Sequence, residues 1–233
     1  VHGEGIVMRV LDRESIQLDL SDMGFSEDTF DAYSDLLRRP HGILLLTGPT
    51  GSGKTTTLYA SLSNMDSDSS KVITVEDPVE YQLKGINQIP VHSQIGLTFA
   101  RALRAILRQD PDIIMIGEMR DTETAQIAVQ SALTGHLVLS TLHTNTAAGA
   151  ITRLEDMGVE RFLITAAVNG VLAQRLIRKL CGHCKQKVEV NDEFLQKSGL
   201  AAFLMSEEKV IYEAVGCETC KNTGYRGRMA IHE

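Results

Sequence analysis

Eight residues in the first quarter of the chain have the types and spacing that phosphate binding requires. Gly48 to Thr55 reads GPTGSGKT, after an apolar run and before a segment of helical character. Glycines let backbone N–H groups turn toward phosphate oxygens, and a helix start adds positive potential. Lys54 can reach the outer phosphates, and Thr55 can bind magnesium. The run predicts a P-loop for ATP and Mg²⁺, with nucleotide contacts from Gly48, Pro49, Thr50, Gly51, Ser52, Gly53, Lys54, Thr55 and Thr56.

Two further segments place carboxylates after apolar runs. TVEDPVE ends at Glu80, and DIIMIGE ends at Glu118. Substrates bind at the carboxyl ends of strands in parallel sheets, so these acids are catalytic candidates. Glu76 and Glu80 compete for the role of general base, with a purely structural turn as the alternative. Glu118 is expected to hold magnesium through water or to polarise the attacking water, although Gly117 stands where a generic P-loop ATPase has a second acid.

Histidines and arginines near these segments are further candidates. His136 and His143 bracket the apolar run 137–142, where they could sense the nucleotide by hydrogen bonds, or be core histidines with satisfied partners. Arg101, Arg104 and Arg108 share one face of a predicted helix. They form either a solvated stripe or a set that stabilises transition-state charge in their own or a neighbouring subunit.

The chain's four cysteines form two CxxC pairs, Cys181 with Cys184 and Cys217 with Cys220. Four thiolates complete a tetrahedral zinc shell and leave no open position, so the predicted site is structural and His183 is not expected to be a ligand. Disulfides in a secreted protein and a redox pair are the alternatives. The nucleotide motif favours the cytosol, and therefore the metal site.

Alternating strands and helices must position these residues. Periodicity and turn signals predict strands at 42–47, 71–76, 112–117 and 136–141, and helices at 27–39, 54–64, 98–109 and 122–134. This alternation predicts an α/β fold with a mostly parallel sheet. Residues 146–157 and 160–180 are expected to be helical, and 6–11 to be a strand from a preceding domain. The cysteine segment is expected to depend on metal for part of its order.

Composition restricts the class of protein. The 233 residues are 43% hydrophobic and 23% charged, which suits a globular chain. No run approaches the roughly 20 apolar residues that span a bilayer, so we expect membrane association only through partners. A net charge of −7 and the lack of aromatic residues alternating with basic ones argue against nucleic-acid binding. The chain starts at Val1 without a signal segment, and we expect it to be part of a longer protein.

Four segments together resemble the ATPases of type II secretion and type IV pilus assembly. They are GPTGSGKTTT, TVEDPVE (the family's aspartate box), RQDPDIIMIGEMRD (its variant Walker B) and TGHLVLSTLHTN (its histidine box). The resemblance covers nearly the whole chain. The CxxC pairs and the closing GYRGRMAIH resemble the assembly branch, because the retraction branch lacks the cysteine module. Within that branch the type II secretion member is favoured.

The resemblance implies a RecA-like P-loop ATPase with a small tetracysteine zinc-binding subdomain, acting as a homohexamer with ATP, Mg²⁺ and Zn²⁺. Glu80 would be the catalytic base, Glu118 would lie at the magnesium water shell, and His136 and His143 would belong to the box that links the sites. It further implies a cytoplasmic motor that powers pseudopilus assembly. Such a motor is expected to associate peripherally with the inner membrane by binding a platform protein and a membrane anchor protein.

The expected organisation has four parts: a domain remnant and linker at 1–20, a RecA-like domain at 21–177, the tetracysteine subdomain at 178–228, and a return toward the ATPase domain at 229–233. The alternatives are a type IV pilus assembly ATPase, a DNA-translocating RecA-like motor and a nucleotide-gated binding module. A type IV secretion ATPase is a nearer relative, but such proteins generally lack the CxxC pairs. Met23–Phe25 are candidate adenine contacts. In relatives the N-terminal domains supply arginines, so the isolated chain is expected to bind ATP, hydrolyse it poorly and remain monomeric.

Overall fold

A computed structural model describes residues 3–6, 8, 19–65, 69–200 and 210–233. The chain divides into two compact units, one formed by Val1–Arg175 with Ala230–Glu233 and the other by Leu176–Met229. The strand expected at 6–11 lies mostly outside the described residues. No helix in the described ranges is long and apolar enough to cross a membrane.

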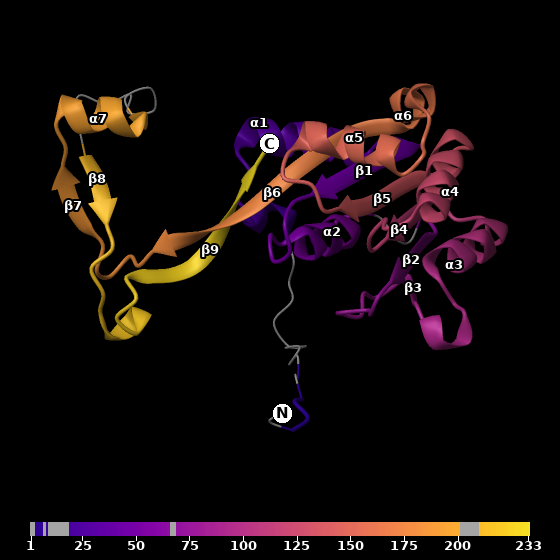
Figure 1. Cartoon of the computed structure of the whole chain (residues 1–233), viewed down its shortest axis with the longest axis horizontal. Coiled ribbons are helices and arrows are strands. Elements are labelled where there is room, and N and C mark those ends of the chain that lie inside the picture. The colour runs from indigo at the N-terminus through magenta and orange to yellow at the C-terminus, as the bar shows by residue number, and fades with distance from the viewer. Residues whose placement is uncertain (1–2, 7, 9–18, 66–68, 201–209) are drawn as a thin grey trace. The chain divides into compact units, whose positions relative to one another are not determined.

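A seven-stranded sheet organises the first unit (Figure 1). Its strands in spatial order are β3 (Asn87–Pro90), β2 (Val72–Glu76), β4 (Ile113–Ile116), β5 (Leu137–Leu142), β1 (Gly42–Thr47), β6 (Val168–Leu180) and β9 (Tyr225–His232). Neighbouring strands from β3 to β6 are parallel. Strands β1, β2, β4 and β5 are buried throughout, as their near-continuous apolar sequences require. The predicted α/β fold with a mostly parallel sheet is confirmed.

Helices cover both faces of this sheet. They are α1 (Glu27–Leu37), α2 (Lys54–Ser63), α3 (Phe99–Ile106), α4 (Thr122–Leu133), α5 (Ala147–Asp156) and α6 (Arg161–Ala167), with short 3-10 helices η1 (Leu20–Met23), η2 (Ser93–Ile95) and η3 (Leu107–Gln109). Alternate residues of β1 belong to different core clusters. Ile43 and Leu45 pack with α3 to α6, whereas Leu44 and Leu46 pack with α1 and α2. This alternation is the period-2 geometry of a strand buried on both faces.

The prediction of a helix over 160–180 is wrong beyond Ala167. The chain continues as β6, whose first residues pair with β1 from Ile43↔Val168 to Thr47↔Ala173. At Gly170 an added Cβ would lie 2.5 Å from a methyl carbon of Leu36, so glycine permits the close approach of α1. Long-range pairing thus outweighs the local helical pattern. Strand β3 was likewise not expected; its four residues, NQIP, are exposed at both ends and half-buried between, without the alternation typical of a strand.

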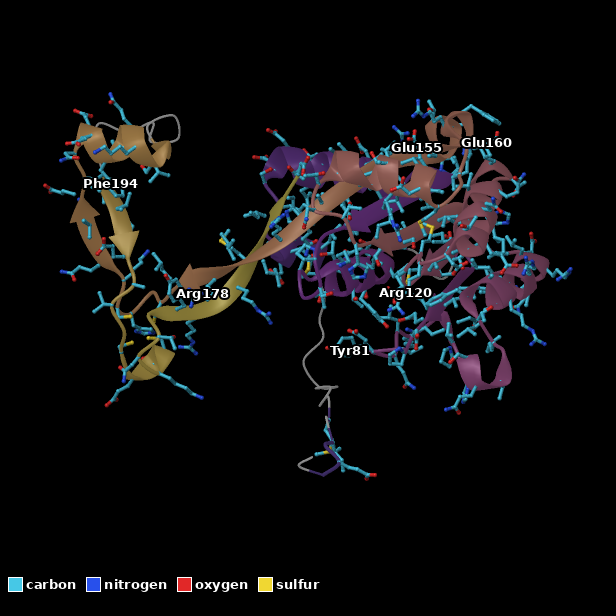
Figure 2. All side chains as sticks on the ribbon, in the orientation of Figure 1. Tyr81, Arg120, Glu155, Glu160, Arg178 and Phe194 are labelled. Atoms are coloured by element: carbon cyan, nitrogen blue, oxygen red, sulfur yellow. The ribbon has the colours of Figure 1, made fainter. Side chains whose placement is uncertain are left out.

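The second unit is small and built from short elements. Strands β7 (Gln186–Glu189) and β8 (Val210–Glu213) form an antiparallel pair, with α7 (Asp192–Ser198) between them in sequence. The 3-10 helix η5 (Glu218–Cys220) ends at Cys220, and Cys217 is its N-cap residue. The outer parts of β6 and β9 also belong here, where the Arg178 guanidinium stacks 3.9 Å above the Tyr225 ring (Arg178 is labelled in Figure 2).

Candidate nucleotide and metal sites

The glycine-rich loop joins β1 to α2 at the carboxyl edge of the parallel sheet. Its backbone turns with φ of 147° at Gly48, 77° at Gly51 and 87° at Gly53. These values favour glycine. At Gly48 an added Cβ would also lie 2.3 Å from the carbonyl oxygen of Gln174. The loop therefore has the shape expected of a P-loop, at the edge of the sheet where P-loops bind phosphate.

Lys54 begins α2 and folds back over this loop. Its amino group donates hydrogen bonds to the carbonyl oxygens of Gly48, at 2.8 Å, and Pro49, at 3.1 Å. Burial lowers the pKa of Lys54, and the charge of Glu118 partly opposes this shift. Those two carbonyls hold the ammonium beside the loop backbone, where bound phosphate oxygens would become stronger partners.

The other predicted nucleotide contacts lie along the same turn. Pro49, Thr50, Gly51 and Thr56 are exposed, and Thr55 is half-buried. The Ser52 hydroxyl is buried and has no hydrogen-bond partner within the described part of the chain. A buried polar group without a partner is costly unless a ligand or water satisfies it. The residues present therefore fit a phosphate group.

Gln174, which the sequence analysis did not single out, ties β6 to the P-loop. Its buried side-chain amide donates to the Ser52 carbonyl oxygen at 2.9 Å. Its side-chain oxygen accepts a 2.8 Å hydrogen bond from the Thr57 hydroxyl, on the first turn of α2. Since 160–180 was expected to be helical, the sequence held no signal that this glutamine faces the loop.

Glu118 follows β4 and lies between two possible cationic partners. Its side chain is 13% exposed, forms an ion pair with Arg120, and has Oε2 at 3.4 Å from Nε2 of His143, the residue that follows β5. Hydrogen bonding to Glu118 raises the pKa of Arg120. Figure 2 labels Arg120 on this segment. The structure thus brings together Glu118 and His143, two of the predicted site residues.

Gly117 occupies the position where a generic P-loop ATPase has an acid, and packing against β2 accounts for the glycine. Its N–H donates to the Val75 carbonyl oxygen at 2.8 Å. An added Cβ would lie 3.3 Å from that oxygen and 3.5 Å from the Cα of Glu76. The close approach of β4 and β2 leaves little room for a side chain.

The two competing carboxylates of the aspartate box have different surroundings. Glu76, the last residue of β2, is only 3% exposed. Its carboxylate accepts hydrogen bonds from the hydroxyls of Tyr59 and Thr74 and from the side-chain amide of Gln88. Glu80 lies in the loop after β2 and is half-buried. Sequence reasoning missed Tyr59, since a tyrosine within an apolar helix reads as core.

Other candidates lie away from this cluster. His136 precedes β5, and its Nδ1 lies 2.8 Å from the Ser131 carbonyl oxygen. Because β5 has six residues, its two ends are roughly 20 Å apart at about 3.3 Å per residue. The structure therefore does not bring His136 to the P-loop edge. The three arginines are exposed: Arg104 pairs with Glu123, Arg101 bonds to the Gly96 carbonyl, and Arg108, on η3 beyond α3, bonds to the Arg104 carbonyl.

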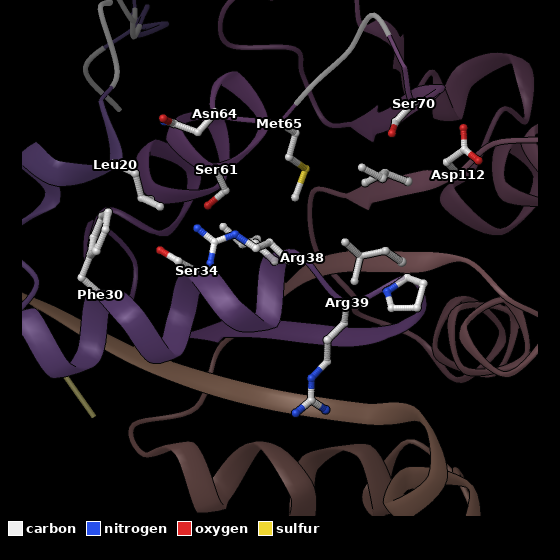
Figure 3. Close-up of a pocket in the computed structure, with 14 residues that line it drawn as sticks. Leu20, Phe30, Ser34, Arg38, Arg39, Ser61, Asn64, Met65, Ser70 and Asp112 are labelled. Carbon is white, nitrogen blue, oxygen red and sulfur yellow. The ribbon is translucent and has the colours of Figure 1, made fainter.

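A cavity of about 590 Å³ lies at the opposite edge of the sheet (Figure 3). It is lined by residues of α1, the end of α2 and the amino ends of β4 and β5, among them Phe30, Arg38, Asn64, Ile113 and Leu137. None of the predicted site residues lines it. It is therefore separate from the edge that carries the P-loop.

The four cysteine sulfurs of the second unit meet in one cluster, all within 4.8 Å of one another. Sulfur separations are 3.9 Å for Cys181–Cys217, 3.8 Å for Cys184–Cys220 and 3.7 Å for Cys217–Cys220. A tetrahedral zinc with bonds of about 2.3 Å needs sulfurs about 3.8 Å apart. All four cysteines are free thiols, and the exposed His183 is outside the cluster. The donor set fits zinc.

Backbone N–H groups stabilise thiolates in this cluster. Burial alone would raise the pKa of Cys220, but N–H groups of Cys217 and Gly224 donate to its sulfur and lower that pKa to about 6. The Gly216 N–H donates to Cys184 at 3.3 Å, although burial raises the pKa of that thiol to about 11. Such bonds are the outer-shell contacts that hold metal-bound thiolates in place.

The profile of the type II/IV secretion system protein family matches residues 1–233. The chain belongs to this family. It is 56% identical over 232 residues to type II secretion system protein E of Dickeya dadantii and 55% identical to type II secretion system ATPase E of Vibrio cholerae. Both matches cover 100% of this chain and 46% of the relative, so the chain spans about half of their length.

A solved family structure supports the fold. The crystal structure of the pilus retraction motor PilT with bound ADP matches with a TM-score of 0.67 and 39% identity, over 75% of this chain and 52% of PilT. The resemblance noted from the four sequence segments is therefore confirmed at the level of the family.

Proposed function

We propose that this chain is the ATP-hydrolysing motor part of a type II secretion ATPase. The observation that carries the proposal is the cluster at the carboxyl edge of the sheet, where the P-loop and Lys54 lie beside Glu118 and His143. The identity of 55–56% to type II secretion proteins over the full chain favours this system over type IV pilus assembly.

Each residue of the edge has a role in this proposal. The P-loop amides and Lys54 bind the phosphates of ATP, and a phosphate oxygen accepts from the Ser52 hydroxyl, which has no partner among the described residues. Magnesium, held by Thr55 and through water by Glu118, would neutralise charge on the phosphates. Glu80 accepts the proton of the attacking water, since Glu76 is enclosed by donors. His143 holds the Glu118 carboxylate, and His136, at the other end of β5, has no contact with the phosphates in its own chain.

The chemistry outside this edge follows the family. Zinc bound by Cys181, Cys184, Cys217 and Cys220 would stabilise the second unit. The working protein is proposed to be a homohexamer in the cytoplasm that contacts the inner membrane through a platform protein and an anchor protein. ATP turnover would drive assembly of the pseudopilus. Stimulation of turnover by DNA would instead favour the translocating-motor alternative.

Glu80→Gln tests the catalytic assignment. The amide keeps the size of the side chain but accepts no proton, so Mg²⁺-dependent ATP turnover is expected to fall roughly 100- to 10,000-fold with ATP binding retained. Turnover is measured by phosphate release in a single-turnover assay of the longer, hexameric protein proposed above, because the isolated chain is expected to hydrolyse ATP poorly. Binding is measured by fluorescent nucleotide titration. The exposed Glu160, labelled in Figure 2, is the matched control, and Glu160→Gln should behave as wild type. Undiminished turnover in Glu80→Gln would refute Glu80 as the base.

A further inference from the structure

A buried hydrogen-bond network joins the P-loop helix to the segment that carries Glu80. Glu76 is 3% exposed and Tyr59, on α2, is fully buried. Among the described residues no basic side chain forms an ion pair with Glu76, whose hydrogen bonds come from Tyr59, Thr74 and Gln88. Burying a carboxylate is costly, so a network that keeps one here without a countercharge needs an explanation beyond packing.

The Tyr59 hydroxyl is both a hydrogen-bond donor and an acceptor. It donates its proton to Glu76, and it accepts the backbone N–H groups of Glu80, at 3.3 Å, and Tyr81, at 3.5 Å. A phenol has one proton and two lone pairs, so the carboxylate that takes the proton also turns the lone pairs toward these N–H groups. Burial raises the pKa of Tyr59, and the hydrogen bond to Glu76 raises it further, so the phenol stays protonated.

Two more contacts hold the same segment. The Tyr59 and Tyr81 rings meet edge to face, with centroids 5.7 Å apart. Gln88 donates to Glu76 at 3.1 Å and to the Tyr81 carbonyl at 2.9 Å, and it accepts the Leu83 N–H at 2.7 Å. The backbone from Glu80 to Leu83 is therefore attached both to α2 and to β3. Figure 2 labels Tyr81 on this segment.

Tyr59 lies five residues after Lys54 on the same helix, α2. One helix therefore joins the P-loop lysine to the hydroxyl that bonds the Glu80 backbone.

We propose that Glu76 and Tyr59 are positioning residues, which set the place of the Glu80 backbone relative to the P-loop. This inference rests on the proposed role of Glu80 as general base. Neither side chain contacts the reacting atoms; both act through the loop that carries Glu80. A misplacement of about 1 Å in a catalytic geometry can reduce the rate roughly 100-fold.

The test removes the hydroxyl alone, in the same longer, hexameric protein. Tyr59→Phe keeps the ring and deletes both contacts to the loop, so kcat for ATP hydrolysis should fall roughly 10- to 100-fold while KM and nucleotide affinity stay within about twofold. Tyr33→Phe is the matched control. Tyr33 is also buried and its hydroxyl also bonds to α2, 2.8 Å from the Ser61 hydroxyl, but it has no contact with the Glu80 loop among its hydrogen bonds. Its kcat should match wild type.

A double-mutant cycle separates positioning from general destabilisation. If Tyr59 acts only through Glu80, Tyr59→Phe should cause no further loss of turnover in the Glu80→Gln background. Glu76→Gln, which keeps the shape and removes the charge, should reproduce the fall in kcat. Unchanged kcat in Tyr59→Phe, or losses that add in the double variant, would overturn the inference and leave Glu80 as the base. Full turnover in Glu80→Gln alone would instead refute the base assignment.

Discussion

At the scale of single residues, identical side chains differ through their surroundings. Glu76 and Glu80 are four residues apart, yet one is enclosed by three donors and the other lies half-buried in a loop. His143 and His136 likewise differ, since only His143 reaches Glu118. The position of each side chain, and not its type, therefore decides which of them can reach a substrate at the P-loop edge.

His232 gives a pH-dependent prediction at this scale. Its ring stacks on Phe25 with centroids 4.1 Å apart, and its Nε2 is buried without a partner in the described part of the chain. Burial lowers the pKa of His232 in the folded state. The unfolded chain therefore binds more protons near pH 6, and the stability due to the neutral ring is present above about pH 6.5 and lost as pH falls.

We expect the melting temperature of wild type to fall between pH 7.5 and 5.5, and to fall less in His232→Phe, which keeps an apolar ring against Phe25. The measurement is thermal unfolding across this pH range. His41→Gln, at an exposed position, should retain the wild-type slope. If the melting temperature of His232→Phe falls with pH as steeply as that of wild type, burial of the His232 ring does not contribute to the pH dependence of stability.

At the scale of elements, β6 contributes to both units, because its first residues lie beside β1 and its last residues belong to the second unit. It pairs with β1 over the residues that precede the P-loop, and Gln174 holds both the loop and the first turn of α2. Residues 168–180, which were expected to be helical, thus form a strand, and this strand supports the P-loop.

Gln174→Leu should weaken nucleotide binding. The change removes the side-chain donor to the Ser52 carbonyl oxygen and leaves the Thr57 hydroxyl with its longer bond to the Gly53 carbonyl oxygen, at 3.3 Å. The expected cost is about 1–3 kcal/mol, equivalent to a loss of about 5- to 150-fold in ATP affinity if the loop loses its shape. The measurement is nucleotide titration with a denaturation curve to separate folding from binding. Gln130→Leu on α4, at an exposed position, is the control. Wild-type ATP affinity in a folded Gln174→Leu protein would show that the Gln174 hydrogen bonds do not maintain the shape of the P-loop.

At the scale of the whole molecule, the two compact units differ in what holds them together. The first has two apolar clusters around a buried sheet, whereas the second has short elements around four cysteine sulfurs. Small units of this kind commonly take part of their folding free energy from metal.

Zinc removal should therefore disorder only the second unit. Elemental analysis is expected to find one zinc per chain in wild type and none in Cys217→Ser, with hydrogen exchange rising over residues 176–229. ATP binding by the first unit should survive, because its core contains no cysteine. His183→Ala should keep the metal. Wild type purified without zinc would refute the structural metal site.

The features that the sequence alone determined are those set by residues close together along the chain. A P-loop, two CxxC pairs and apolar runs ending in acids need fixed short spacings, so the phosphate loop, the thiolate set and the buried strands β1, β2, β4 and β5 could be predicted. Only tertiary structure decided that 168–180 is a strand, that Gly117 packs against β2, and that Gln174 and Tyr59 reach the site. These outcomes depend on pairing and burial between segments distant in sequence, which no local periodicity records.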